Sequence, residues 1–255
     1  MKISIITVSF NSEKTIEQTI RSVLSQENVD IEYIIIDGGS TDGTLDIIKK
    51  YQDNITSWTS EKDEGIYDAM NKGIKRTTGD VVGILNSDDF YPSSNVLEKI
   101  MKCFRDNPTV NACYGDLIFV EKNNIRNITR YWKTGDYNRK NLKYGWMMPH
   151  PTFFVRASVY EKVGLFRTDF FIAADYELMI RALKVHNIKI IYIPEVLACM
   201  RTGGYSGKNI FRRFLSWKEQ YRAWFVNDIT PPFFLVLSRF LKRIPEFFNK
   251  PSTKN

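Results

Sequence analysis

The first 110 residues alternate between short apolar runs and segments whose apolar residues recur at helical spacing. The runs are rich in Ile and Val and predict buried strands. They lie at residues 3–10, 31–37, 55–61 and 80–86. Between and after them, apolar residues three or four positions apart predict amphipathic helices, as at Ile16, Ile20 and Val23. Repeated strand–helix units of this length imply a mostly parallel sheet covered by helices.

After residue 110 this alternation becomes less regular. Residues 112–120 and 125–132 read as antiparallel strands joined by a short turn, and residues 148–156 as an extended segment. Residues 172–187 predict a helix, and residues 188–194 a last strand. Aromatic and basic helical segments follow Arg201 and are interrupted at Pro231 and Pro232.

Polar residues follow each of the four predicted parallel strands. Ser9 and Asn11 follow the first strand, Asp37 the second, Glu61 and Asp63 the third, and Asn86 to Asp89 the fourth. Ligands of such sheets bind beyond the carboxyl ends of the strands. The sequence therefore predicts an acidic binding site along one edge of the sheet.

Asp88 and Asp89 are adjacent carboxylates with no basic residue beside them. Two like charges at the end of a buried strand resist burial unless something compensates them. Hard oxygen ligands suit Mg²⁺ or Mn²⁺, which take the rest of their coordination shell from water and a substrate diphosphate. A turn that caps the next helix is the alternative, but it needs only one Asp.

The turn DGGSTDGT, residues 37–44, is compatible with two interpretations. It forms a capped turn, because its glycines allow positive φ, or it presents Asp37 to a base or ribose. The spacing of its acids excludes an EF-hand loop. The chain also lacks the glycine patterns of dinucleotide-binding and P-loop proteins.

Two further residues are candidates for chemistry in the second half. Asp175 begins a predicted helix after an apolar run, as an ordinary N-cap or as a general base. His150 lies between two prolines, as a turn residue or as a polar contact in a pocket. Glu177 is expected to pair with Arg181, one helical turn later.

The net charge of +7 is concentrated at the end of the chain. Residues from 201 on carry 11 basic and 3 acidic side chains, whereas the first 200 carry 25 and 26. Basic residues mixed with aromatics in 207–255 predict a helical, amphipathic extension that lies on an anionic membrane surface, or packs against the body. No nucleic-acid motif accompanies them.

The remaining composition indicates a cytoplasmic protein. The three cysteines form no paired framework, and two histidines do not suffice for a His-rich zinc site. The first apolar run is too short for a signal peptide, and no run is long enough to span a membrane. We therefore expect a cytoplasmic protein that is peripheral on the inner face of the cell membrane.

Five segments together resemble the family 2 glycosyltransferases of the GT-A fold. They are SIITVSFNSEKTIEQTIRSVLSQ, EYIIIDGGSTDGT, DEGIYDAMNKGI, GDVVGILNSDDFY and AADYELMIRA. The similarity runs in order over residues 1–206, with a nucleotide-sugar-binding half at about 1–110 and an acceptor-binding half at about 111–206. It implies inverting transfer of a sugar from a nucleotide-sugar, usually a UDP-sugar, with Mg²⁺ or Mn²⁺. The acceptor would be a saccharide or a lipid-linked saccharide of cell-surface polysaccharide synthesis.

The resemblance also assigns roles to matching positions. Donor contacts fall on Thr7, Ser9, Asn11, Asp37, Asp63, Asn86, Asp88 and Arg201. Asp89, with Asp88, matches the acids near the metal and the diphosphate, and Asp175 matches the catalytic base. Asn86 departs from the family pattern, which often has Asp there. The segment after Arg201, residues 201–207, resembles one that closes over the diphosphate.

Two other functions use the same acids. A non-catalytic nucleotide-sugar-binding protein would keep them without turnover. A nucleotidyltransferase would use the same combination of acids and metal, but usually has a glycine-rich, basic triphosphate loop near the first strand, which residues 7–15 lack.

Overall fold

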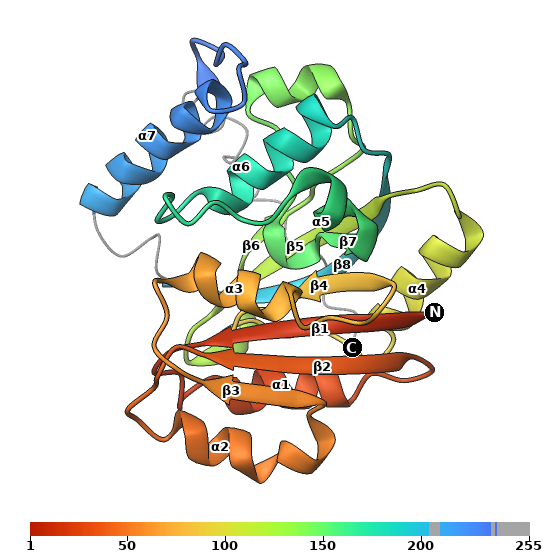
Figure 1. Ribbon diagram of the computed structural model, residues 1–255, viewed down its shortest axis with the longest axis vertical. Helices are drawn as coiled ribbons and strands as arrows, with labels where there is room; N and C mark the ends of the chain where they lie inside the picture. The colour runs from red at the N-terminus through yellow and green to blue at the C-terminus, as the bar shows by residue number, and fades with distance from the viewer. Residues whose placement is uncertain (204–209, 236–237, 239–255) are drawn as a thin grey trace.

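The computed structural model describes residues 1–203, 210–235 and 238 of the chain (Figure 1). Its centre is an eight-stranded sheet in the order β3-β2-β1-β4-β7-β5-β6, with β8 paired to β5. The first four strands are mutually parallel, so their carboxyl ends share one edge. They are β1 (Lys2–Ser9), β2 (Asp30–Asp37), β3 (Ser57–Ser60) and β4 (Val81–Ile84).

The second half extends the sheet with mixed strand directions. The strands are β5 (Ala112–Glu121), β6 (Asn124–Trp132), β7 (Phe154–Arg156) and β8 (Ile190–Arg201). β7 is antiparallel to both β4 and β5, and β8 is parallel to β5. The carboxyl end of β8 therefore points to the same edge as those of β1 to β4. This arrangement brings Arg201 to the acidic edge.

Helices cover both faces of the sheet, as the sequence predicted. Alternate residues of β1 point to opposite faces: Ile3 and Ile5 belong to one buried cluster, and Ile6 and Val8 to the other. The first cluster includes residues of α1 (Ile16–Leu24), α2 (Thr44–Lys50) and α4 (Val96–Asp106). The second includes residues of α3 (Ile66–Ile74), α5 (Ala157–Val163), α6 (Ala174–Ile180) and α7 (Ile210–Phe225).

Three segments differ from their sequence-based expectations. The helix predicted over 172–187 is α6 followed by a π-helical stretch, η4 (Arg181–Val185). The extended segment 148–156 contains a 3₁₀ turn, η3 (His150–Thr152), before β7. The last strand, β8, continues to Arg201, seven residues beyond the predicted end at residue 194.

Two further 3₁₀ turns complete the described elements. They are η1 (Gln52–Asn54) and η2 (Arg139–Tyr144).

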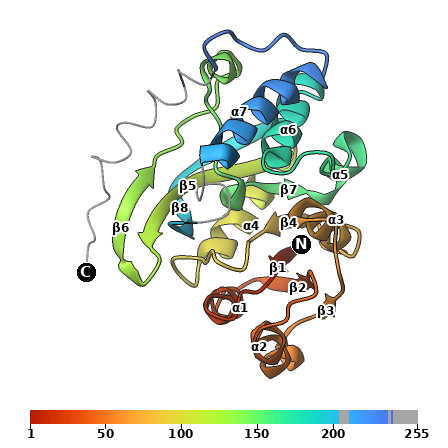
Figure 2. The ribbon, with the colours of Figure 1, turned by 90° about the vertical axis from the view of Figure 1, so that its left-hand side faces the viewer.

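The helix α7 packs along α6 instead of standing apart from the body (Figures 1 and 2). Trp224 on α7 is fully buried, and its Nε1 donates a hydrogen bond to the hydroxyl of Tyr176, at 2.9 Å. Within the described residues, no helix combines the length and the apolar character needed to cross a membrane. Most of the segment expected to close over the diphosphate, residues 204–207, lies outside the described residues, as do 239–255 of the C-terminal extension.

Candidate functional site

A cavity of about 2350 Å³ opens at the carboxyl edge of the sheet. One wall comes from the loops after β1, β3 and β4. The opposite wall comes from residues 147–151, from residues 168–176, and from α7. Predicted site residues that line it are Ser9, Asn11, Asp63, Asn86, Asp88, His150, Asp175 and Arg201. Thr7, Asp37 and Asp89 lie behind this surface, because each is fully buried.

Asp37 cross-links the ends of three strands. Its Oδ1 accepts from the hydroxyls of Ser9 on β1, at 2.9 Å, and of Ser40. Its Oδ2 accepts from the N–H groups of Gly39 and Ser40 and from the hydroxyl of Ser60 on β3. A buried carboxylate with five donors fixes the 37–44 turn. Its expected contact with a base stays a prediction.

Asp63, in the loop after β3, lines the cavity. Its Oδ1 accepts from the N–H group of Gly65, at 2.9 Å. A Cβ atom on Gly38 would collide with its Oδ2, so the glycine allows this close approach. Asn11, in the left-handed region with φ of 48°, joins the first loop to the turn by accepting from the N–H of Thr41.

The loop after β4 holds the two adjacent aspartates in different environments. Asp88 is partly exposed and lines the cavity, whereas Asp89 has no exposed surface. Burial, and then the charge of Asp88, raise the pKa of Asp89 well above its usual range. Oδ1 of Asp89 and Oδ1 of Asn86 are buried without a hydrogen-bond partner among the described residues. Such acceptors suit a cation.

Arg201 lies against this loop from the end of β8. It is 6% exposed, and its Nη1 donates to the backbone carbonyl of Asp88 at 2.5 Å. Its Nη2 donates to Gln18, and its guanidinium carbon lies 5.0 Å from the ring centroid of Phe90. Arg201 therefore provides a fixed positive charge beside the paired acids.

The residues present fit a divalent cation held jointly with a diphosphate. Asp88, Asp89 and Asn86 offer hard oxygen atoms, including the two buried oxygens that no described residue satisfies. The part of the chain that the structure describes contains no group of three or more His, Cys, Asp or Glu side chains able to hold a metal ion. A metal here would therefore take further ligands from the donor and from water.

Asp175 lies at the start of α6, on the opposite wall. Its Oδ1 accepts from the N–H of Tyr176 at 2.8 Å and from the hydroxyl of Tyr67, on α3, at 3.3 Å. Burial, and then the charge of Asp175, raise the pKa of Tyr67 well above its usual range, so Tyr67 remains a donor. The two halves of the domain thus meet at Asp175.

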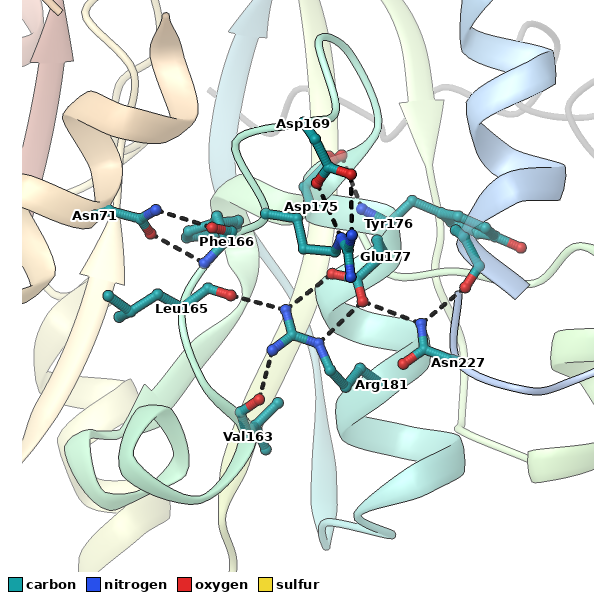
Figure 3. Close-up of polar contacts among 12 residues, drawn as sticks. Asn71, Val163, Leu165, Phe166, Asp169, Asp175, Tyr176, Glu177, Arg181 and Asn227 are labelled. Carbon is teal, nitrogen blue, oxygen red and sulfur yellow. Dashed lines mark hydrogen bonds and ion pairs between the residues drawn. The ribbon is translucent and has the colours of Figure 1, made fainter. Parts of the chain in front are cut away.

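A second contact of α3 lies beside the one between Tyr67 and Asp175. Asn71, one turn after Tyr67 on α3, donates to the carbonyl of Phe166 and accepts from its N–H, both at 2.9 Å (Figure 3). The ring of Phe166 stacks on Tyr67. The sequence interpretation missed Tyr67 and Asn71. The signal that could have identified them is their position, since both lie on the inward, apolar face of the helix predicted after residue 65.

His150 lies near Asp175 and lines the cavity, as the pocket interpretation expected. Its ring meets that of Phe166 edge-on, with centroids 5.7 Å apart. Burial lowers the pKa of His150, and the charge of Asp175 partly opposes this shift. A role in acceptor binding stays a prediction.

The expected pair of Glu177 and Arg181 is confirmed (Figure 3). The Arg181 guanidinium donates to both carboxylate oxygens of Glu177, at 2.9 and 2.8 Å, and to the carbonyls of Val163 and Leu165. Glu177 also accepts from Asn227, just after α7. This buried network fixes α6, and with it the helix that carries Asp175.

Comparison with known proteins identifies the family. Residues 4–164 match the model of Glycosyl transferase family 2. The chain belongs to this family. An uncharacterized glycosyltransferase of Mycobacterium tuberculosis is 32% identical over 185 residues, which cover 72% of this chain and 69% of the relative. A PGL/p-HBAD biosynthesis glycosyltransferase of Mycobacterium bovis is 27% identical over 216 residues, 83% of this chain and 82% of the relative.

Solved structures confirm the predicted GT-A fold of the family. The mannosyltransferase PcManGT of Pyrobaculum calidifontis, in complex with GDP-Man and Mn²⁺, matches with a TM-score of 0.66 and 18% identity, over 94% of this chain and 69% of its own. S. aureus TarS with UDP-GlcNAc matches with a TM-score of 0.63 and 18% identity, over 89% of this chain. The chain spans 65% of that TarS structure.

Proposed function

We propose that this protein is an inverting glycosyltransferase that moves a sugar from a nucleotide-sugar to a hydroxyl of a saccharide or lipid-linked acceptor in cell-surface polysaccharide synthesis. One observation carries the proposal. A single cavity is lined by Asp63 and Asp88 from the nucleotide half and by Asp175 from the other half. This arrangement suits a donor on one wall and a base on the other.

The donor would lie along the loops after the parallel strands. Ser9, Asn11 and Asp63 offer polar groups to the base and ribose, and Asp88 lies where a diphosphate would follow. UDP-GlcNAc in TarS and GDP-Man in PcManGT support a nucleotide-sugar, although the two nucleotides differ. We retain a UDP-sugar as the first candidate, with a hexosyl or N-acetylhexosaminyl group to be transferred.

Asp88 and Asp89, with Asn86, would hold Mg²⁺ or Mn²⁺ together with the donor diphosphate. When bound, the metal would act as a Lewis acid and neutralise negative charge that develops on the leaving nucleoside diphosphate. Arg201 adds a fixed positive charge on the same side. Mn²⁺ in the PcManGT complex supports this assignment.

Asp175 would act as the general base. Its carboxylate takes the proton from the acceptor hydroxyl while that oxygen attacks the anomeric carbon, and the nucleoside diphosphate leaves from the opposite face. A single displacement of this kind inverts the configuration and needs no enzyme nucleophile. The hydroxyl of Tyr67 holds Asp175 in place. General-base catalysis contributes roughly 10²–10⁴ in rate.

The acceptor would occupy the rest of the cavity. Its volume of about 2350 Å³ exceeds the roughly 300–1000 Å³ of ordinary small-molecule sites, so room remains beside a donor. Phe171, Trp217 and Phe234 line this part and keep about half or more of their surface exposed. Aromatic walls suit a sugar ring or an apolar anchor. The relative named for PGL/p-HBAD biosynthesis supports a lipid-linked acceptor.

We also retain the proposal that the C-terminal extension contacts the inner membrane surface. The outward face of α7 exposes Phe214 by 62% and Phe225 by 63%, next to Lys218. The inward face of the same helix is buried against α6. Apolar side chains beside a cation match an anionic interface.

Titration calorimetry with UDP-, GDP- and dTDP-sugars, with and without Mn²⁺, tests the proposed function. We expect one donor class to bind, at least about tenfold more weakly without metal. A protein that binds none of them would contradict the proposal. Binding without transfer or hydrolysis under any condition would favour a non-catalytic binding protein. Release of pyrophosphate from a nucleoside triphosphate and a sugar phosphate would favour a nucleotidyltransferase.

A further inference from the structure

The carboxylate of Glu219, on α7, accepts hydrogen bonds from three consecutive backbone N–H groups. Oε1 accepts from Phe171 at 2.8 Å, and Oε2 accepts from Ile172 and Ala173, both at 2.9 Å. Glu219 is only 4% exposed. Hydrogen bonds to a charged acceptor are about twice as strong as neutral ones, and burial strengthens them further.

The segment held by Glu219 leads directly into the proposed base. Ala173 is the residue before α6, and Asp175 is the second residue of that helix. Phe171, Ile172 and Ala173 also line the cavity. The direction in which Asp175 enters the cavity therefore depends on a carboxylate from the C-terminal helix.

Other residues of α7, or just after it, contact the chain on both sides of this segment. Arg222 donates to the carbonyl of Asp169, at 2.8 Å, and to its carboxylate. Asn227 donates to Glu177 at 3.0 Å (Figure 3). Trp224 donates to the hydroxyl of Tyr176. These contacts fix the helix, whereas Glu219 contacts residues 171–173, directly before α6.

Simple helix packing does not explain a carboxylate at position 219. Trp224 and the neighbouring apolar residues already supply the packing of α7 on the body. A buried carboxylate has a desolvation cost that an apolar residue avoids. What it adds is a fixed geometry for three N–H groups, which an apolar residue would leave unsatisfied.

We infer that Glu219 is a positioning residue for Asp175: it holds residues 171–173 so that the Asp175 carboxylate faces the cavity. This inference rests on the proposed role of Asp175 as general base. A displacement of about 1 Å from the reactive geometry can lower a rate about 10²-fold. The donor-binding residues on the opposite wall do not contact Glu219, so their affinity for the donor should not change.

The test compares Glu219→Ala, Glu219→Gln and, as a matched control, Glu161→Ala on the exposed surface of α5, all in the full chain. Hydrogen–deuterium exchange reports on the amides of 171–173. Steady-state kinetics separates kcat from KM for the donor that calorimetry identifies. In Glu219→Ala, we expect these amides to exchange at least about tenfold faster and kcat to fall about 10²-fold, with the donor KM within about twofold.

Glu219→Gln keeps one acceptor oxygen, the amide carbonyl. The exchange rates of amides 171–173 and the kcat of this variant should therefore lie between those of the wild type and Glu219→Ala. The Glu161→Ala control should match the wild type in the exchange of amides 171–173 and in kcat. Unchanged exchange of 171–173 in Glu219→Ala would overturn the contact, whether or not the protein transfers sugar. Faster exchange with wild-type kcat would overturn the positioning role. Failure of the wild type to bind any donor would instead count against the proposed function, and the exchange result would still decide the contact.

Discussion

At the scale of single residues, neighbours in sequence differ most in what surrounds them. Asp88 and Asp89 are adjacent, yet one lines the cavity and the other is fully buried. The turn over residues 86–89, in which the N–H of Asp89 donates to the carbonyl of Asn86 at 3.0 Å, separates the two side chains, but the sequence does not say which residue faces which way. In this conformation, a ligand in the cavity reaches Asp88 first.

We predict that Asp88→Asn weakens Mn²⁺-dependent donor binding more than Asp89→Asn does. Loss of the Asp88 carboxylate, which lines the cavity, should lower the affinity for the donor about 10–100-fold. Loss of the buried Asp89 carboxylate should lower it less, because Asp89 acts on the ligand through neighbouring residues. Titration calorimetry of both variants with the same donor and Mn²⁺ measures the difference. The reverse order would identify Asp89 as the direct ligand, as the family resemblance implies.

His150 predicts a pH dependence of stability. Burial lowers its pKa, so the folded protein keeps this histidine neutral where an unfolded chain, with a pKa near 6.5, binds a proton. Stability should therefore fall as the pH decreases below about 6.5, by up to roughly 1.4 kcal/mol per pH unit for one proton. Urea unfolding at pH 7.5 and 5.5 should show a smaller fall for His150→Gln than for the wild type.

His186, which is partly exposed, provides the control for this measurement. His186→Gln should lose as much stability as the wild type between the two pH values, because this variant leaves His150 and its surroundings in place. Equal losses in the His150→Gln variant and the wild type would show that His150 is not held neutral by its surroundings.

At the scale of elements, periodicity predicted the central helices and strands well. The predicted apolar positions Ile16, Ile20 and Val23 of α1 are buried, and the antiparallel pairing of β5 with β6 is confirmed. Predictions of element ends were less successful, because β8 continues to Arg201, beyond the predicted end at residue 194.

The last described helix shows why tertiary contacts cannot be read from composition. The mixture of basic and aromatic residues in α7 predicts either membrane contact or packing. Trp224 and Glu219 are buried against α6 and its preceding turn, whereas Phe214 and Phe225 are exposed. Which face packs depends on partners in residues 169–177, and no local pattern in α7 identifies them.

The exposed face of α7 predicts membrane binding that is separable from folding. Replacing Phe214 and Phe225 together by Ser should reduce sedimentation with vesicles rich in phosphatidylglycerol about tenfold or more, because both side chains lose their contact with the interface. Ile125→Ser, on the exposed part of β6, is the control and should sediment like the wild type. Undiminished sedimentation of the double variant would contradict this role of α7.

At the scale of the whole molecule, the sheet edge that the sequence predicted is the one where the cavity opens. Parallel order alone brings Ser9, Asp63 and Asp88 to this edge, so the nucleotide side could be predicted without a structure. The opposite wall could not. It depends on contacts between distant segments, such as Tyr67 with Asp175 and Glu219 with Ala173, which no spacing rule reveals.

The most direct test of this account is the transfer rate of Asp175→Asn, measured with the donor that binds and a saccharide or lipid-linked acceptor. We predict a folded variant with donor affinity within about twofold of the wild type and a transfer rate lower by roughly 10²–10⁴. The same substitution at the exposed Asp106, on α4, should leave the rate unchanged. Wild-type transfer by a folded Asp175→Asn protein would contradict the assignment of Asp175 as the base.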